Sequence, residues 1–496
     1  MRSVVVLVVL CLVGAFAEEL PVWALRDHYS FEGDAAAFRF DVQRAIWKLD
    51  VTGLGDVVGD VQAEIVLGDG RAIAIPDLVF EKDGREKFDG PMGAGSMFSS
   101  TFKPKDGLAV RCAIARFEKQ PFLVLYLDAK NAGTTPLEIA AIRPAVVGVG
   151  GIRASSGTMT VTRLASDQRG DRVGVQDGEG AGLFQIQLSS PPVILALGVL
   201  QSGRADSRIN FVPAGAKWQG NIECKFNPPV TLAPGEEISC DPLWISFGTP
   251  EPERVNEFFS WAQSVYPESP FKRTFPPEAW VSVKSGDSAD DLVQAARAWK
   301  GSGVKHALIP AGFVDRDPKG IAQRLATEGM APGLTVDPLA DGGKWLNPSN
   351  RQDRATALEN MRKFAQPPFK FFAVEPSLIP DKELRQFKLT RREADSAAFR
   401  IMVEAADELP VVASPSISLG DEVLRWRLAT AAAKILGRYT NGIAPVRFEV
   451  SKANELTPEL ISLITSFNGP VELVGEPKAN LRGEIAKAVA AQPGAD

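Results

Sequence analysis

Residues 279–313, AWVSVKSGDSADDLVQAARAWKGSGVKHALIPAGF, decide the fold of the second half of the chain. The stretch opens with a short apolar run that is typical of a buried strand. SADDLVQAARAWKGSG follows with helical spacing of its apolar residues, and Ser288 followed by Asp291 predicts the start of that helix. KHALIPAGF then begins a second strand. A strand, a helix and another strand in this order indicate a parallel sheet.

The same alternation of strand and helix continues toward the C-terminus. The later apolar runs, each followed by a helical pattern, are APGLTVDPL, KFFAVEPSL, PVVASPSI, PVRFEVS and PVELVGE. About seven or eight such units in a row favour a (β/α)8 TIM-like barrel over an open sheet. We therefore expect this barrel to occupy residues 273–496.

The N-terminal half has a different pattern. Segments such as AFRFDVQRAIWKLDV and FLVLYLDAKNAG alternate apolar and polar residues and are separated by Gly, Pro, Asn and Asp. This period of two predicts an antiparallel β-sandwich over residues 18–250. Residues 251–272 then predict a linker helix with Val255, Phe258, Phe259, Ala262 and Val265 on one face. The fold class is accordingly multidomain, β followed by α/β.

The first residues predict export. Residues 1–17 contain one Arg, an apolar run and Ala15-Phe16-Ala17, which is the pattern of a cleaved secretory signal. A lipid anchor at Cys11 is less favoured because bulky Leu10 precedes it. We expect cleavage near Ala17, a secreted or periplasmic protein, and no membrane association after cleavage.

Few residues could bind a metal or act as thiol nucleophiles. Cys224 and Cys240 flank a segment with a Pro-Gly turn and could form a disulfide in an oxidising compartment, which would leave Cys112 buried and free. The chain has no CxxC, and its two histidines, His28 and His306, are far apart. We therefore expect no metal and no cofactor.

Composition and charge narrow the class of partner. The chain has 496 residues, of which 45% are hydrophobic and 23% charged, with a net charge of -6. This composition is typical of a folded soluble protein. Nucleic acid is an unsuitable partner, because phosphate binding needs a concentrated basic surface.

In the predicted barrel, functional side chains belong at the carboxyl ends of the strands. The charged and aromatic residues that follow the expected strands are Lys284, Asp287, Asp315, Asp317, Asp337, Asp341, Trp345, Glu375, Asp421 and Glu422. Carboxylates with a Trp nearby are typical of carbohydrate sites, where acids serve catalysis and an aromatic face packs on a sugar ring.

The sequence of the C-terminal half resembles that of the α-galactosidase and raffinose-synthase group of glycoside hydrolases, in which a β-sandwich precedes a (β/α)8 barrel. The resemblance runs in register over roughly residues 230–490 and includes GMAPGLTVDPLAD and FFAVEP, the latter where the family has its nucleophilic Asp. It implies catalytic roles for Glu375 and Asp421. The residues expected to bind substrate are Asp315, Asp337, Asp341, Trp345 and Arg425.

The sequence departs from the family pattern at several positions. Pro310 and Ala311 stand where the family's second strand carries aspartates for sugar hydroxyls. Ala373 replaces a Lys two residues before the nucleophile, and Glu375 is one methylene longer than the family's Asp. IAPVRFE replaces a late Asp-Pro-Asp. Each missing hydrogen bond weakens binding of the transition state.

Several candidates also have an ordinary structural interpretation. Glu375 could be a solvated carboxylate at a strand end, and Asp421 could cap the helix that follows it. Asp337 could sit in an Asp-Pro turn. We expect Trp280 to pack in a core and His306 to be a satisfied strand histidine.

Three functions are compatible with these patterns. The first is a catalytically impaired or inactive relative of the glycosidases that binds an oligo- or polysaccharide, or another protein. The second is an active retaining glycoside hydrolase with Glu375 as nucleophile. The third is a periplasmic structural or interaction protein. The sequence predicts no particular oligomeric state.

Overall fold

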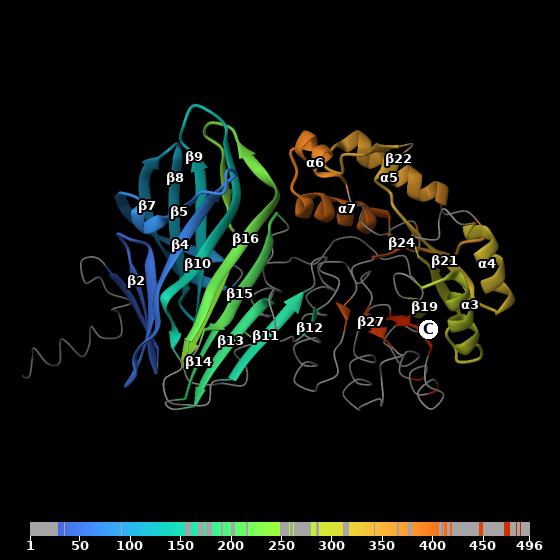
Figure 1. Cartoon of the computed structure of the whole chain (residues 1–496), viewed down its shortest axis with the longest axis horizontal. Coiled ribbons are helices and arrows are strands. Elements are labelled where there is room, and N and C mark those ends of the chain that lie inside the picture. Colours follow the sequence, from blue (N-terminus) through green and yellow to red (C-terminus); the bar gives the residue numbers. More distant parts are fainter. Residues whose placement is uncertain are drawn as a thin grey trace, which may run out of the picture.

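The structure is a computed structural model of the chain. It describes residues 28–33, 35–90, 92–153, 160–166, 173–174, 181–189, 192–199, 204–214, 217–248, 257, 261, 279–283, 287–310, 317–341, 343–364, 367–374, 379–405, 409, 411–413, 417–418, 446–449, 471–476, 483 and 487. Figure 1 shows the antiparallel strands of the N-terminal half, blue to green, beside the yellow-to-red strands and helices of the C-terminal half.

The N-terminal half is antiparallel, as predicted. Its described strands are β1 (His28–Glu32), β2 (Ala36–Asp41), β3 (Ile46–Val51), β4 (Gly55–Leu67), β5 (Ala72–Ala74), β6 (Phe80–Gly90), β7 (Gly93–Lys105), β8 (Leu108–Phe117), β9 (Phe122–Asn131), β10 (Leu137–Arg153), β11 (Thr160–Ser166), β12 (Val173–Gly174), β13 (Ala181–Ser189), β14 (Pro192–Val199), β15 (Asp206–Ala214), β16 (Lys217–Leu232), β17 (Glu237–Ser239) and β18 (Leu243–Gly248). A short 3-10 helix, η1 (Ile75–Asp77), follows β5. The strands enclose one apolar core, which is consistent with a sandwich.

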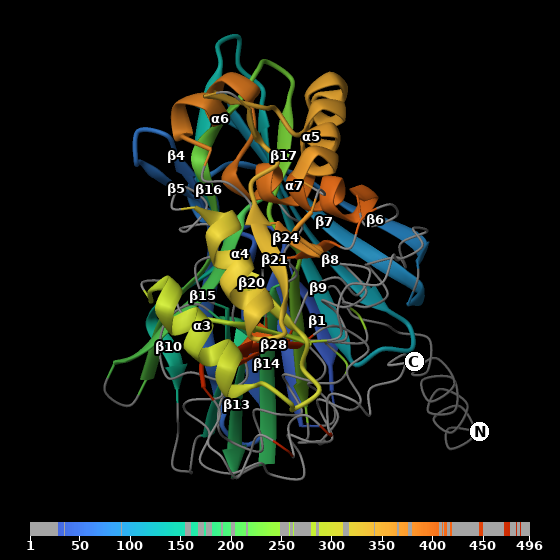
Figure 2. The same ribbon diagram turned by 90° about the vertical axis from the view of Figure 1, so that its right-hand side faces the viewer.

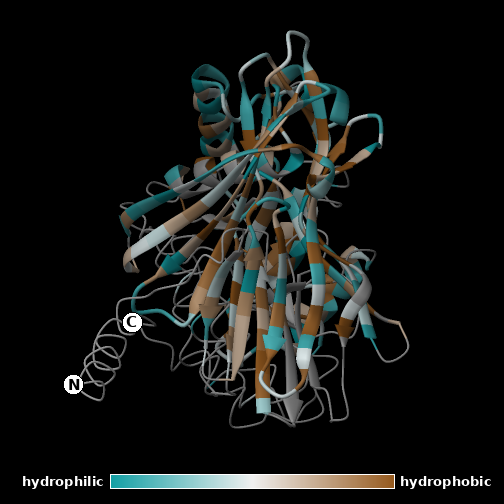
Figure 3. Cartoon of the chain, turned by 90° about the vertical axis from the view of Figure 1, so that its left-hand side faces the viewer, coloured by the Kyte–Doolittle hydropathy of each residue, from teal (hydrophilic) through white to brown (hydrophobic). Residues whose placement is uncertain are grey.

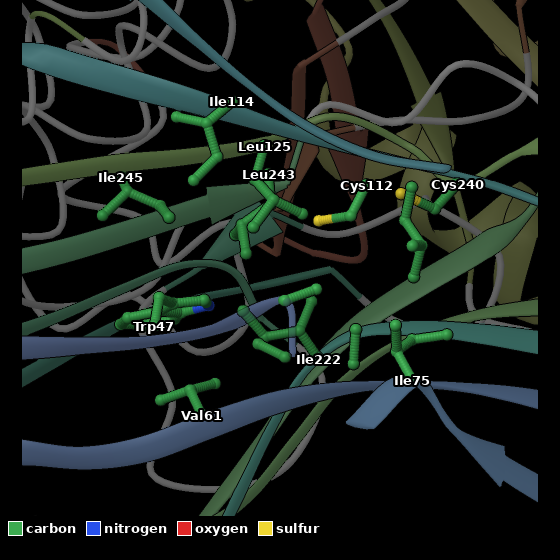
Figure 4. Close-up of a cluster of buried hydrophobic side chains, with 14 of the residues drawn as sticks. Trp47, Val61, Ile75, Cys112, Ile114, Leu125, Ile222, Cys240, Leu243 and Ile245 are labelled. Atoms are coloured by element: carbon green, nitrogen blue, oxygen red, sulfur yellow. The ribbon is translucent and has the colours of Figure 1, made fainter. Parts of the chain in front are cut away.

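Alternation of side chains explains why these residues form strands. In β3, Trp47, Leu49 and Val51 are buried, whereas the residues between them are half-buried. Figure 3 shows the resulting alternation of hydrophilic and hydrophobic residues along the strands. Trp47 stacks on Phe38 with the ring centroids 5.2 Å apart. Figure 4 shows Trp47 within the core, together with the side chains that surround it.

The C-terminal half contains a parallel sheet. Its strands are β19 (Ala279–Ser282), β20 (His306–Ile309), β21 (Ala331–Val336), β24 (Phe371–Val374), β25 (Val411–Ala413), β26 (Ile417–Ser418), β27 (Val446–Glu449) and β28 (Val471–Val474). Their order is β25-β24-β21-β20-β19-β28-β27-β26. The pairings among the described residues do not include β25 with β26, so the predicted barrel is not seen closed in this part of the chain.

Helices alternate with these strands. They are α3 (Ala289–Ala298), α4 (Pro318–Thr327), α5 (Arg351–Phe364), α6 (Asp381–Phe387) and α7 (Arg391–Ala405). The predicted start of α3 is confirmed, because Ser288 and Asp291 form a reciprocal capping box. Figure 2 shows α3 and α4 in front of the strands β19, β20 and β21. A core of apolar side chains fills the space between helices and sheet, and Trp299, which directly follows α3, is fully buried in it.

The opposite face of the sheet carries a second, smaller apolar cluster. Trp280, Leu308, Phe371 and Ala373 pack together there, from β19, β20 and β24. Trp280 is 1% exposed, and its ring centroid lies 5.6 Å from that of Phe371. The expectation that Trp280 packs in a core is confirmed.

Polar contacts join the two halves. Arg385 Nη1 of α6 lies 2.9 Å from Glu138 Oε1 of β10. Arg204 Nε lies 2.9 Å from Glu393 Oε1 of α7, and Thr390 Oγ1 donates to the carbonyl oxygen of Arg204 over 2.7 Å. The first helices after β24 therefore rest on the sandwich.

Two residues of the predicted linker helix are described. Both Glu257 and Trp261 are helical, and Trp261 is buried with its ring 6.5 Å from that of Phe122. Ser246 Oγ donates to Glu257 Oε2 over 3.5 Å, so this side of the helix contacts the sandwich. The apolar face predicted from the sequence lies outside the described residues.

The three described cysteines, Cys112, Cys224 and Cys240, are buried free thiols. The disulfide that the sequence allowed between Cys224 and Cys240 is therefore absent from this structure. The predicted signal segment lies outside the described residues. None of the described helices combines the length and the hydropathy needed to span a bilayer.

Candidate functional site

The strand register brings the carboxyl ends of neighbouring strands to one edge of the parallel sheet. Val336, the last residue of β21, pairs with Val374, the last residue of β24. Val374 in turn pairs with Ala413, which ends β25. Loops that follow such strands lie together, and in parallel sheets this edge is where binding sites form.

Asp337 lies at this edge, directly after β21. Leu334 and Val336 pack with the helices, so alternation puts Thr335 and then Asp337 on the side of Phe371 and Ala373. Asp337 is half-buried, and its Oδ1 accepts the backbone N–H of Leu339 over 2.9 Å. The Asp-Pro turn considered from the sequence is therefore present, and it fixes the carboxylate at the edge.

A small hairpin follows Asp337. It consists of β22 (Ala340–Asp341) and β23 (Lys344–Trp345), in which Asp341 pairs with Lys344 and Ala340 with Trp345. Leu346 N donates to Leu339 O over 2.8 Å. Leu339 and Leu346 are both buried, so the hairpin is anchored at its base and carries exposed Asp341 and Lys344 at its tip.

Trp345 is only partly available at this edge. Its side chain is half-buried and packs against the core between helices and sheet. The sequence suggested a ring that could stack on a sugar, and that contact stays a prediction. Lys344 was not singled out from the sequence. The turn DGGK, residues 341–344, is nevertheless a hairpin signal that could have indicated it.

Four of the predicted site residues lie outside the described residues. These are Glu375, Asp421, Asp315 and Arg425. Asp337, Asp341 and Trp345 are described and lie on the segment that follows β21. Their binding role and the proposed catalytic pair stay predictions.

Asp317, another carboxylate after a strand, has a structural role. Its Oδ1 accepts the backbone N–H of Gly320 over 3.0 Å and caps α4. Asp317 also adopts a left-handed backbone conformation, with φ of 71°. It is exposed at the start of a helix, so its side chain is occupied by the cap.

His306 lies at the amino end of β20, away from the carboxyl edge. Its ring meets that of Phe371 edge-on at 5.8 Å. Burial, together with the nearby charge of Lys305, lowers the pKa of His306. The neutral imidazole is thereby favoured, in line with the expected strand histidine.

The sheet face that leads to the edge is apolar. Ala373 is 2% exposed and packs with Trp280 and Phe371. The indole N–H of Trp280 has no hydrogen-bond partner among the described residues. Within the same part of the chain, no three His, Cys, Asp or Glu side chains gather as metal ligands would.

Comparisons with known proteins show what this fold is similar to. No protein-family model matches the chain, and no curated protein is similar to it in sequence. Among solved structures, an alpha-N-acetylgalactosaminidase from Bifidobacterium bifidum, a quadruple mutant, has a TM-score of 0.51 at 9% identity, covering 93% of this chain and 92% of that one. The galactosidase domain of an alpha-galactosidase-sucrose kinase has a TM-score of 0.50 at 9% identity, covering 94% and 84%. The chain therefore has a glycoside hydrolase-like fold, similar to the folds of these two proteins.

Proposed function

We propose that this chain binds an oligo- or polysaccharide at the carboxyl edge of its parallel sheet and has lost most or all hydrolytic activity. The fold supports the choice of ligand, because the two solved structures that it resembles are glycosidases by name. We also propose that residues 1–17 direct export and are then removed.

The proposal includes closure of the sheet into a (β/α)8 barrel. The two strands at the ends of the sheet order, β25 and β26, are separated in the chain only by residues 414–416. A link this short cannot place two parallel strands side by side, because such strands need a crossover of about a dozen residues or more. All described pairings in this sheet are parallel. Closure would require β25 and β26 to be two parts of one strand that pairs with β24 on one side and with β27 on the other. The carboxyl ends would then surround one opening.

The observation that carries the loss of hydrolysis is the apolar packing around Ala373. In the resembling family a Lys at this position stands two residues before the nucleophile, and aspartates stand where this chain has Pro310 and Ala311. A hydrogen bond to a charged group contributes about 1.5–3 kcal/mol, so two such losses would slow hydrolysis about 10²- to 10⁴-fold.

Binding a sugar needs fewer precisely placed polar groups than hydrolysing a glycosidic bond. The carboxyl edge of the parallel sheet retains groups that could bind a sugar. Asp337 is held by the Leu339 N–H, which presents a carboxylate to sugar hydroxyls without further ordering. Asp341 on the hairpin could add a hydrogen bond, and half-buried Trp345 could add an apolar contact. Asp315 and Arg425 are proposed as further ligands on the family pattern.

An active retaining hydrolase is the second candidate. The strand register favours it: Val374, the last residue of β24, pairs with Val336, the last residue of β21. The residues that follow these two strands, Glu375 and Asp337, are therefore expected at the same edge of the sheet. Glu375 would then act as nucleophile and Asp421 as acid/base. A retaining enzyme needs the two carboxyl groups about 5 Å apart.

Two assays on the same preparations test the proposal. Hydrolysis of a panel of aryl α- and β-glycosides is measured for the parent and for Glu375→Gln, and binding of an oligosaccharide panel is measured by calorimetry. We expect no turnover, and binding that Asp337→Asn weakens about tenfold or more, because a charge-assisted hydrogen bond is lost. The Asn amide oxygen can still accept from Leu339. Glu359→Gln, an exposed carboxylate on α5, is the matched control and should bind as the parent does.

Three outcomes separate the candidates. Turnover by the parent that Glu375→Gln loses would establish the hydrolase and overturn the proposed loss of activity. If Asp337→Asn leaves binding unchanged, the proposed position of the binding site at this edge is wrong. If the protein shows no turnover and no binding, a carbohydrate function is contradicted and a structural or protein-binding role is favoured.

A further inference from the structure

The three buried thiols of the sandwich are not equivalent. Cys224 on β16 is 0% exposed, and Cys240, directly after β17, is 4% exposed. A hydrogen bond joins these two thiols, and it is the main reason that the pKa of Cys240 is raised, followed by burial. Burial, with the charge of Asp128, raises the pKa of Cys112 to about 12. Figure 4 shows Cys112 and Cys240 among the core side chains.

Contacts with two neighbouring strands hold the segments that carry Cys224 and Cys240 in place. Cys224 pairs with Ser207 across β16 and β15. The hydroxyl of Ser207 donates to the carboxylate of Asp241, the residue after Cys240. Cys240 N donates to Leu127 O over 2.9 Å, which ties the same segment to β9. Two contacts therefore fix the segment that carries Cys240: one to β15, the neighbour of β16, and one to β9.

We propose that Cys224 and Cys240 are an oxidisable pair that forms a disulfide within the sandwich core. The oxidant is a small-molecule disulfide such as oxidised glutathione. One cysteine thiolate attacks it, forms a mixed disulfide and releases one glutathione thiol. The second cysteine thiolate then attacks the cysteine sulfur of this mixed disulfide, forms the Cys224–Cys240 bond and releases the other glutathione as its thiolate. The two cysteines lose two protons and two electrons in total, and one glutathione disulfide becomes two thiols.

Burial determines when this reaction can occur. The thiolate is the reactive form, and thiols in an apolar core are rarely ionised and poorly accessible. We therefore expect slow oxidation of the folded protein and fast oxidation while the sandwich folds. The bond would enclose residues 225–239, including β17, and would stabilise the fold chiefly by restricting the unfolded chain.

The test uses the full chain with Cys11→Ser, so that only the three core thiols count. The protein is refolded by dilution from denaturant into a mixture of oxidised and reduced glutathione, then denatured, alkylated and weighed by mass spectrometry. We expect one alkylated cysteine, compared with three in fully reduced protein, and a Cys224–Cys240 peptide in a non-reducing digest. The oxidised form should also melt at a higher temperature than the reduced form.

Two variants make the result specific. Adding Cys112→Ser is the matched control, and it should still lose two reactive thiols. Adding Cys224→Ser should leave two alkylatable thiols. The same count on natively purified protein kept with oxidised glutathione under mild denaturant makes the result independent of refolding yield. Three alkylatable thiols under both regimes, a bond to Cys112, or a stable glutathione adduct would each overturn the proposal.

Discussion

The two halves of the molecule use their charged residues differently. In the sandwich, charges pair across neighbouring strands: Arg143 of β10 contacts Glu223 of β16 at 2.8 Å and Glu64 of β4 at 3.3 Å. In the parallel half, the ion pair between Arg297 and Glu328 at 2.8 Å joins the ends of α3 and α4 on the helical side. Asp337 instead lies at the carboxyl edge of the sheet.

This difference follows from sheet geometry. Neighbouring antiparallel strands run in opposite directions, so their carboxyl ends lie alternately at two edges of the sheet. The side chains that follow the strands are therefore divided between these edges. Parallel strands collect all their carboxyl ends at one edge. The parallel sheet of the C-terminal half therefore suits the candidate site better than the antiparallel sandwich does.

The largest expected effects come from one buried tryptophan in each half. Trp47→Ala and Trp299→Ala should each lower the free energy of unfolding by about 3–5 kcal/mol, because each leaves a cavity in a filled core. Trp299 also loses the hydrogen bond from its indole N–H to Gly475 O, 3.2 Å long.

Urea unfolding followed by circular dichroism checks this pair of variants. If the halves are energetically separate, each variant shifts a different transition. A single transition that both variants shift equally would contradict the separation. Val79→Ala is the control, since Val79 is 62% exposed and its loss should change stability by less than about 0.5 kcal/mol.

A lysine in place of Ala373 tests the contrast between the apolar face of the sheet and the exposed hairpin at its carboxyl edge. Ala373→Lys should destabilise the parallel half by about 3 kcal/mol, because an amine would be buried beside Trp280 and Phe371 without a partner. Ala340→Lys makes the same change at an exposed hairpin position and should be nearly neutral. Thermal melting of both variants gives the comparison. Unchanged stability of Ala373→Lys would show that this face has room and a partner for a charge.

The smallest expected effect is a pH dependence from His306. Because burial lowers the pKa of His306 below its usual value of about 6.5, the unfolded chain binds this proton more readily than the folded chain. The stabilisation is present above pH 6.5 and is lost as the pH falls through the folded pKa. Urea unfolding at pH 7.5 and pH 5 should therefore show a smaller loss of stability in His306→Gln than in the parent. Equal losses would rule out this contribution.

Local patterns predicted local structure well. The alternation in IWKLDV gave β3 with Trp47 and Leu49 inward, and the Ser288–Asp291 spacing gave the capping box of α3. Both depend on neighbours in sequence, since strand alternation and helix capping are set within a few residues.

Side-chain partners across the fold were harder to predict. Asp317 followed a strand, as a site residue would, but it caps α4. Trp345 packs partly on the helical core because the hairpin between Leu339 and Leu346 turns it there. Spacing brought Cys224 and Cys240 together as a possible pair, but only the contact between β15 and the segment after β17 shows what holds them. These choices depend on residues far apart in sequence.

The strand order has a consequence for synthesis on the ribosome. β19, the earliest strand of the parallel sheet, lies between β20 and β28, the latest described one. Ala279 to Ser282 pair with Val471 to Val474, so β19 waits for almost the whole half to be translated before it gains its second neighbour. Most sandwich strands, by contrast, pair with the strand made just before them. The sandwich can therefore fold first and offer α6 and α7 a surface while the parallel sheet is still incomplete.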